Sequence, residues 1–243
     1  MSTNPTHAML LAAGLGTRMR PLSNETPKPM LPLGGRALID LALDRLADAG
    51  VTDVVVNKHY KADRLEAHLN EREMSPRVHL HHEDELLETG GGVRAALNLL
   101  GDAPFFVVNG DSVWLDGPTP TLERMAKAWG DDIDVLLLFH RTFQVQAEIG
   151  LGDFVLDPLG GVRRPKELEI VPYLYAGIQM LRPSFVATAE PGRFSMNKLW
   201  DQAIEAGRLR AIVHDGLWFH LSTPQDLAEA EFALHGALVG STT

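Results

Sequence analysis

The chain has 243 residues, of which 45% are hydrophobic and 22% are charged, and its formal net charge is −10 at pH 7. This composition is that of a folded globular protein, and it excludes a disordered chain, a collagen or a coiled coil as the main state. The acidic balance argues against nucleic acid as a partner, because non-specific binding to it needs a basic surface. The absence of cysteine excludes disulfides, thiolate metal sites and cysteine nucleophiles.

The N-terminal region lacks the features of a signal peptide. Its apolar run, Ala8 to Ala13, is too short, and no basic segment precedes it. No run reaches the roughly 18 apolar residues of a membrane span. We therefore expect a cytoplasmic protein with no membrane partner, either a monomer or a small homo-oligomer.

The first part of the chain, about residues 7–140, alternates short apolar runs with longer amphipathic ones. Strands are predicted at Met9–Ala13, Val54–Asn57, Val78–His82, Phe105–Asn109 and Val135–Phe139, and helices at Ala37–Ala49, Lys61–Leu69, Gly91–Leu100 and Leu122–Trp129. Since strands and helices alternate, we expect an α/β fold with a Rossmann-like, mostly parallel sheet and helices on both faces.

The pattern changes after about residue 140. Short strands are predicted at Gly150–Leu156, Gly161–Arg164 and Tyr173–Leu181, followed by helices at Met196–Ala206 and Pro224–Leu234, with Thr223 as N-cap of the last. Residues 236–243 are expected to form a frayed tail. No linker interrupts the chain, so we expect one domain over residues 1–243, with a small β-rich lobe and closing helix at about 141–235 added to the core.

The first candidate site is a glycine-rich loop that follows the first strand. Gly14 and Gly16 would let backbone N–H groups approach a phosphate. Arg18 offers a bidentate cation, and Lys28 a point charge between two prolines. The P-loop pattern is absent, and Met19 stands where a dinucleotide fingerprint needs its third glycine. A tight turn is the alternative for the two glycines alone.

The second candidate site follows the most hydrophobic predicted strand, which ends in Asn109, Gly110 and Asp111. The carboxyl ends of parallel strands are where such sheets bind ligands, and a carboxylate there is suited to Mg²⁺. The alternative is that Asp111 caps the next turn. A third signal is the triplet Gly90–Gly92 before a helix, which indicates close backbone approach or an anion at the helix N-terminus, with an ordinary loop as the alternative.

In this order, Gly14–Pro21, Pro27–Pro29 and Gly110–Asp111 resemble the G-x-G-T-R-x-R-P, P-K-P and G-D signature of the sugar-1-phosphate nucleotidyltransferases, and the resemblance covers nearly the whole chain. It implies a GT-A-like fold and the reaction of a nucleoside triphosphate with a sugar 1-phosphate to give an NDP-sugar and pyrophosphate. The compact length, Leu86–Gly92 and Gly152–Phe154 are most similar to bacterial N-acetylmuramate 1-phosphate uridylyltransferases of cell-wall recycling. Mannose-1-phosphate guanylyltransferases are the close alternative, and a catalytically weak nucleotide- or sugar-binding regulator is an alternative of another class.

The resemblance also implies residue roles, with residues 7–140 as the nucleotide-binding core and the later lobe binding the sugar. Arg18 would hold the leaving pyrophosphate, Lys28 would neutralise charge near the α-phosphate, and Asp111 would bind Mg²⁺. The implied nucleotide-binding residues are Ala12, Ala13, Gly14, Gly16, Thr17, Glu83, Thr89, Gly90 and Asn109. The implied sugar-binding residues are Gly152, Asp153, Tyr175 and Gly177.

The sequence departs from the family pattern at two places. His220 stands where W-x-D-[VI]-G-T has the aspartate that is the second metal ligand. Imidazole prefers softer ions than Mg²⁺, so either His220 joins the site and Mn²⁺ substitutes well, or Asp111, phosphates and water hold Mg²⁺ without it. The family's E-K-P near the sugar phosphate has no clear equivalent. Arg164 and Lys166 are candidates for that role, and a solvated charge cluster is the alternative.

Overall fold

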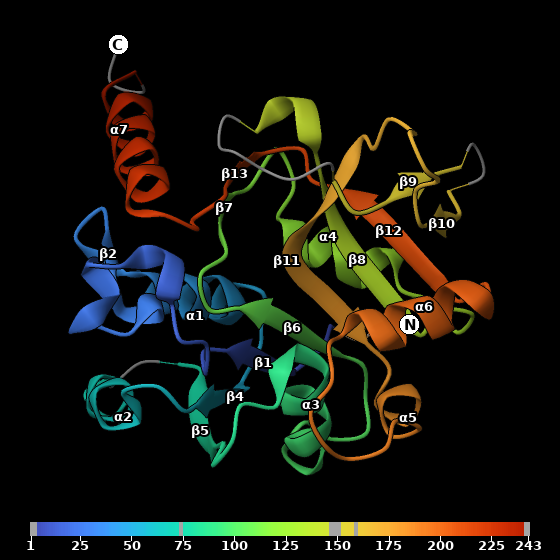
Figure 1. Ribbon diagram of the computed structural model, residues 1–243, viewed down its shortest axis with the longest axis horizontal. Helices are drawn as coiled ribbons and strands as arrows, with labels where there is room; N and C mark the ends of the chain where they lie inside the picture. The colour runs from blue at the N-terminus through green and yellow to red at the C-terminus, as the bar shows by residue number, and fades with distance from the viewer. Residues whose placement is uncertain (1–3, 73–74, 146–151, 158–159, 241–243) are drawn as a thin grey trace.

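The computed structural model describes residues 4–72, 75–145, 152–157 and 160–240, and its centre is a seven-stranded sheet (Figure 1). The strand order is β12-β8-β11-β6-β1-β4-β5. These strands are β1 (His7–Leu11), β4 (Asp53–Lys58), β5 (Arg77–His82), β6 (Phe105–Asn109), β8 (Val135–Arg141), β11 (Tyr173–Leu181) and β12 (Leu209–Val213). Only β11 runs antiparallel to its neighbours in this sheet, which confirms the predicted, mostly parallel arrangement.

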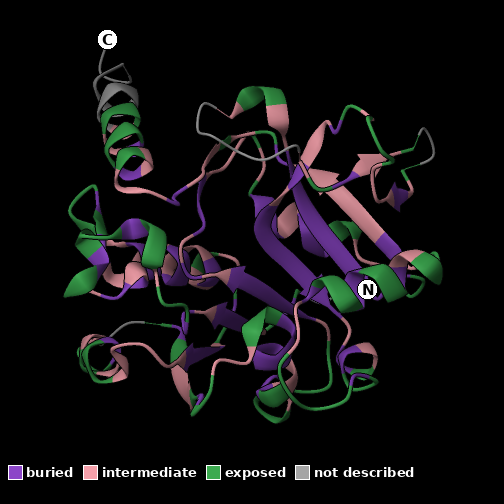
Figure 2. Ribbon diagram, in the orientation of Figure 1, coloured by how far each residue is buried: buried purple, intermediate pink, exposed green. Residues whose placement is uncertain are grey.

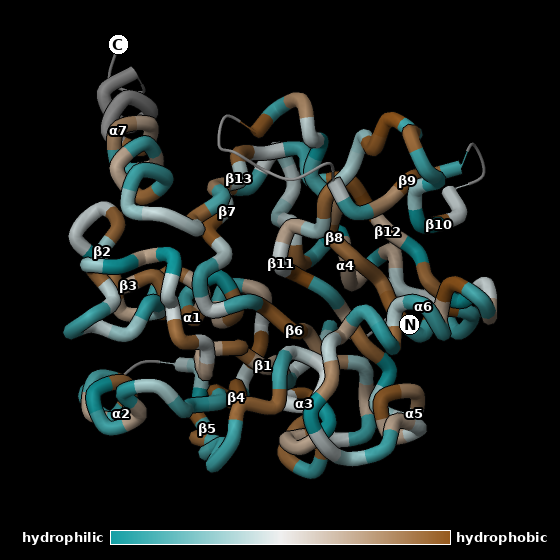
Figure 3. Tube along the Cα trace, viewed as in Figure 1, coloured by the Kyte–Doolittle hydropathy of each residue, from teal (hydrophilic) through white to brown (hydrophobic). Residues whose placement is uncertain are grey.

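Helices cover both faces of the sheet, as predicted. Residues of α1 (Leu38–Asp48), α2 (Ala62–Asn70) and α4 (Thr121–Ala128) pack in one hydrophobic cluster, and residues of α3 (Glu88–Ala95), α5 (Pro183–Val186) and α6 (Asn197–Glu205) pack in another. Within β1, Ala8 and Leu10 belong to the first cluster and Met9 to the second, because successive side chains of a strand point to opposite faces. The central strands are accordingly buried (Figure 2) and hydrophobic (Figure 3).

Three small ribbons and several single turns complete the fold. The ribbons pair β2 (Pro32–Leu33) with β3 (Arg36–Ala37), β7 (Val113–Leu115) with β13 (Leu217–Phe219), and β9 (Val155–Leu156) with β10 (Val162–Arg163). The 3₁₀ turns are η1 (Thr17–Met19), η2 (Leu22–Asn24), η3 (Lys28–Met30), η4 (Leu97–Leu99) and η5 (Thr142–Gln144). The small lobe predicted after residue 140 is wrong for Tyr173–Leu181, because this segment is β11 and pairs with β6 and β8 inside the central sheet. Of the short strands predicted there, those of the β9–β10 ribbon lie outside that sheet. Residues 150 and 151 of the predicted strand lie outside the described residues.

The last helix, α7 (Pro224–Gly240), stands away from the sheet (Figure 1). Thr223 is its N-cap, as predicted: Asp226 N donates to Thr223 Oγ1 at 3.2 Å, and Asp226 Oδ2 accepts from Thr223 N at 2.7 Å. The predicted frayed tail is wrong for residues 236–240, which continue the helix. An established helix gains a hydrogen bond with each added residue, and one interior glycine costs only about 1 kcal/mol. No helix in the described ranges is long and apolar enough to span a bilayer.

Candidate active site

The strand register brings the first two candidate sites to one edge of the sheet. Leu11, the last residue of β1, pairs with Asn57 of β4 and with Asn109 of β6. Because these strands are parallel, the glycine-rich loop after β1 and Asp111 after β6 leave the sheet side by side. This is the carboxyl edge, where open α/β sheets bind ligands.

A cavity of about 220 Å³ lies at this edge. Its lining contains the predicted residues Ala12, Ala13, Gly14, Gly16, Lys28, Glu83, Thr89, Asn109 and Asp111. Leu11, Pro29, Asn57, Leu86 and Glu88, which the motifs did not single out, line it as well. Asn109 was selected as a polar residue at the carboxyl end of a predicted parallel strand. Asn57 meets the same criterion, so the sequence could have identified it. Glu88 precedes the predicted Thr89, but nothing in the sequence distinguishes it from the other acidic residues of the same segment.

Glycines bring the two charged residues of the cavity together. Gly16 has φ +61°, and a Cβ there would lie 3.1 Å from Lys28 Cβ, so the loop packs directly on the lysine. Gly110 N donates to Leu11 O at 2.9 Å, and a Cβ on Gly110 would lie equally close to that oxygen. Asp111 is therefore held beside the loop, where its Oδ2 accepts a hydrogen bond from Lys28 Nζ in an ion pair. The Lys28 side chain is only 13% exposed, which keeps the ammonium at the cavity rather than in bulk solvent.

The comparisons with known proteins agree with this geometry. A model of the nucleotidyl transferase family matches residues 7–149. The chain belongs to the nucleotidyl transferase family. It is 42% identical over 96% of its length to an N-acetylmuramate alpha-1-phosphate uridylyltransferase from Caulobacter vibrioides, covering 99% of that relative. It is 31% identical over 90% of its length to a mannose-1-phosphate guanyltransferase from Aspergillus fumigatus, of which it covers 61%.

A solved structure confirms the fold class of this nucleotidyltransferase. The structure of a UDP-glucose pyrophosphorylase complexed with UDP-glucose has a TM-score of 0.78, covers 96% of this chain and 99% of its own, and is 18% identical. At that identity the likeness concerns the fold alone. The family and the curated relatives make the chain a sugar-1-phosphate nucleotidyltransferase, which binds a nucleotide and a sugar phosphate.

The glycine triplet lies inside α3 rather than before a helix as predicted, and it packs closely on another segment of the chain. Gly90 N and Gly91 N donate to Phe194 O at 3.1 and 3.0 Å, and a Cβ on Gly90 would lie 2.4 Å from the Phe194 ring. Gly90 itself does not line the cavity. Thr89 does, although its Oγ1 accepts a hydrogen bond from Met196 N at 3.0 Å. The triplet therefore joins α3 to the segment before α6.

The predicted sugar-side residues lie on or beside β11. The Tyr175 ring packs edge-on against Trp200 at 4.8 Å between centroids. Burial, together with the nearby negative charge of Asp111, raises the pKa of the Tyr175 hydroxyl. Asp153 Oδ2 accepts a hydrogen bond from Tyr175 N at 2.8 Å, so this carboxylate holds the strand in place.

Gly152 and Gly177 are required by close packing. Gly177 has φ +79° and lies where the register of β11 against β8 shifts, and a Cβ there would lie 2.0 Å from Ser112 Oγ. Gly152 has φ +92°, and its Cβ would lie 2.8 Å from Val171 Cγ1. Gly177 therefore lets β11 approach Ser112, which follows β6, and Gly152 lets its segment pack on Val171, which precedes β11.

Arg18 and His220 lie outside the cavity lining, and His220 is near enough to Lys28 and Asp111 for their charges to affect its pKa. Arg18 is exposed, and no ion pair joins it to another residue in the described part of the chain. Burial lowers the pKa of His220, as do the charges of Arg18 and Lys28, while Asp226 and Asp111 raise it. The neutral imidazole is thus favoured beside these cations. No group of three or more His, Asp or Glu side chains suited to a metal ion occurs among the described residues.

The two candidates for the missing E-K-P differ in their surroundings. Arg164 Nε donates to Asp201 Oδ1 at 2.8 Å, and its guanidinium lies 4.5 Å above the Phe154 ring. Lys166 is exposed. Arg164 thereby ties the small lobe to α6, which leaves less of its charge for a substrate.

Proposed function

We propose that this nucleotidyltransferase joins UTP to N-acetylmuramate 1-phosphate, giving UDP-N-acetylmuramate and pyrophosphate, and acts in cytoplasmic cell-wall recycling. The observation that carries the proposal is the 42% identity, over nearly the full length of both chains, to a relative that bears this activity in its name. The intact set of Arg18, Lys28 and Asp111 supports an active enzyme over a regulator that has lost its activity.

We propose that the reaction is an in-line displacement. A phosphate oxygen of the sugar 1-phosphate attacks the α-phosphorus of UTP, and the bond from that phosphorus to the pyrophosphate oxygen breaks. Such a reaction needs positioning and charge neutralisation rather than a covalent intermediate. We assign Lys28, which pairs with Asp111, to charge neutralisation at the α-phosphate, and the exposed Arg18 to binding of the leaving pyrophosphate.

Mg²⁺ is proposed as the metal ion, with Mn²⁺ able to replace it. The Asp111 carboxylate offers the hard oxygen ligand that Mg²⁺ prefers, and this ion usually takes one or two carboxylates together with substrate phosphates and water. When bound, Mg²⁺ neutralises negative charge on the phosphates. The lack of a three-residue ligand group among the described residues favours Asp111 over a fuller protein cage.

Pyrophosphate release from a grid of substrates tests the proposal. UTP, GTP, dTTP and CTP are each combined with N-acetylmuramate 1-phosphate, mannose 1-phosphate and glucose 1-phosphate, with Mg²⁺ and again with Mn²⁺. We expect one dominant pair, UTP with N-acetylmuramate 1-phosphate. A dominant GTP and mannose 1-phosphate pair would instead support the function named for the Aspergillus relative. Silence across the grid would favour the binding protein.

A further inference from the structure

Two buried polar side chains join the walls of the nucleotide cavity. Asn57, near the end of β4, and Glu83, directly after β5, are 3% and 2% exposed. Ala12 N donates to Asn57 Oδ1 at 2.7 Å, Asn57 Nδ2 donates to Glu83 Oε1 at 2.7 Å, and Leu87 N donates to Glu83 Oε2 at 3.1 Å. The chain of bonds therefore runs from the first loop (residues 12–16) to the second loop (residues 84–89), in which we include the first two residues of α3.

The direction of this chain is fixed by chemistry. The backbone N–H of Ala12 can only donate, so the amide oxygen of Asn57 must face it and the amide NH₂ must face Glu83. Both carboxylate oxygens of Glu83 then accept from N–H groups, which compensates for burial of the charge. Each member occupies the one orientation that satisfies its neighbours.

The third glycine of the triplet is explained by the same contact. A Cβ on Gly92 would lie 2.7 Å from Glu83 Oε1 and 3.1 Å from Asn57 Nδ2. Only glycine lets α3 pack this closely on the pair. The two loops that line the cavity and helix α3 therefore all contact the same pair of side chains.

We propose that Asn57 and Glu83 are positioning residues that fix the separation of the two nucleotide-binding loops, and that Glu83 acts through Asn57 and Leu87 rather than on the base. Ala12 and Gly14 line the cavity from the first loop, and Leu86 and Thr89 line it from the second. A displacement of about 1 Å between groups that hold a substrate can cost roughly 10²-fold in rate. This role does not depend on which base or sugar the enzyme uses.

A polarity swap tests the proposal. Asn57→Asp puts two carboxylates face to face, and Glu83→Gln leaves one N–H group facing another whichever way the new amide turns. The double variant Asn57→Asp/Glu83→Gln restores all three bonds with the same net charge, because the new carboxylate accepts from Ala12 N and from the new amide, whose oxygen accepts from Leu87 N. Glu85→Gln removes the same charge from an exposed position in the same loop and serves as the control.

The readout is the dissociation constant of the folded protein for UTP and for GTP, by titration calorimetry, with thermal unfolding alongside. We expect each single variant to raise both constants about tenfold or more with their ratio unchanged, and the double variant to return to within about threefold of wild type. Unchanged constants in a folded single variant, or a double variant that unfolds like wild type and still binds weakly, would overturn the proposal. A changed UTP-to-GTP ratio with Glu83→Gln that the double variant does not restore would assign Glu83 to the base instead.

If the single variants do not fold, the double variant and Gly92→Ala decide the matter. The added methyl group presses on Glu83 and Asn57 without altering their charges. We expect it to raise both nucleotide dissociation constants about threefold or more. Wild-type nucleotide binding by a folded Gly92→Ala protein would show that the pair does not set the loop separation.

Discussion

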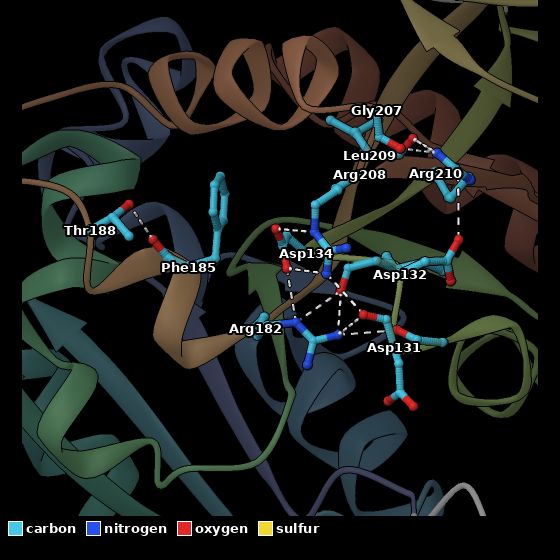
Figure 4. A network of polar contacts seen from close by, with 12 residues as sticks. Asp131, Asp132, Asp134, Arg182, Phe185, Thr188, Gly207, Arg208, Leu209 and Arg210 are labelled. Carbon is cyan, nitrogen blue, oxygen red and sulfur yellow. Dashed lines mark hydrogen bonds and ion pairs between the residues drawn. The ribbon is translucent and has the colours of Figure 1, made fainter.

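The two edges of the central sheet differ in how fully the protein itself pairs their charged side chains. At the amino end of β8, Asp134 is shared by Arg208, with Nε to Oδ2 at 2.7 Å, and Arg182, with Nε to Oδ1 at 2.9 Å (Figure 4). Arg182 Nη2 also donates to Ile133 O at 2.7 Å. At the carboxyl edge, Lys28 has Asp111 beside it, and exposed Arg18 has no ion pair within the described residues.

This difference leads us to assign the charged residues of the amino edge to stability and those of the carboxyl edge to the reaction. Asp134, Arg182 and Arg208 join the starts of β8 and β12 to the end of β11, and their hydrogen bonds are satisfied within the protein. At the carboxyl edge, Lys28 has a single carboxylate partner, and Arg18 is left for a ligand that brings its own negative charge. Changes at one edge are therefore expected to alter unfolding, and changes at the other to alter turnover.

Lys28→Ala is expected to have the largest effect on activity. Loss of a preorganised charge at the reacting phosphate should lower kcat/KM roughly 10²–10³-fold while the thermal midpoint stays within a few degrees of wild type. Pyrophosphate release and calorimetry measure the two effects. Lys127→Ala, which removes an exposed lysine paired with Glu123, is the matched control. Activity within threefold of wild type would remove Lys28 from the reaction.

Arg18→Ala is expected to lower kcat/KM by about 10–100-fold, because the leaving pyrophosphate loses one charge-assisted contact. Stability should not change, since the guanidinium is exposed and is not part of an ion pair among the described residues. Inhibition by added pyrophosphate provides a second measurement and should weaken by a similar factor. Unaltered pyrophosphate inhibition would contradict the assigned role.

Asp134→Asn is expected to destabilise the protein by about 2–3 kcal/mol, because two arginines lose their shared carboxylate. The figure is set below that of a fully buried pair, since the arginine side chains are 25% and 36% exposed. Urea unfolding measures it, and kcat/KM of the folded protein should stay unchanged. Asp132→Asn, whose contact with Arg210 is 3.5 Å long, should change the free energy of unfolding by less than about 0.5 kcal/mol.

His220→Asp is expected to lower the Mg²⁺ concentration that gives half-maximal activity about three- to tenfold, because a second carboxylate joins Asp111 near the phosphates. His220→Asn is the control without a charge. An identical Mg²⁺ requirement in the aspartate variant would show that position 220 takes no part in metal binding.

Acid should reduce the effect of Asp134→Asn. Hydrogen bonds from Arg208 and from Arg182 hold the pKa of Asp134 below its ordinary value, so its contribution is complete above the unfolded pKa near about 4 and declines as pH falls toward the folded pKa. The difference in unfolding free energy between wild type and the variant should therefore be constant from about pH 8 to 5 and shrink below about pH 4. A difference that grew on acidification would contradict this assignment.

The sequence by itself determined the α/β class, most element positions and the charged residues of the carboxyl edge. Local signals suffice for these. Tyr173–Leu181 is predicted as a strand from its own composition, and Lys28 stands in the P-K-P motif, whose resemblance to the nucleotidyltransferase signature implies its role. The frayed tail failed because helix propagation continued through a glycine near the end of α7. The separate lobe failed for Tyr173–Leu181 because this strand pairs with β6 and β8 in the central sheet, which its own composition does not show.

Only the tertiary structure decided which partner each polar group takes. Asn57 and Glu83 are separated by 25 other residues, and their hydrogen bonds exist because parallel pairing of β4 with β5 sets their strand ends side by side. The same holds for the three glycines of α3, whose neighbours are Phe194, Gly192 and the Asn57–Glu83 pair. A sequence records the conformational freedom of a glycine or the polarity of an asparagine, whereas the neighbour that makes either one necessary depends on strand register and helix packing.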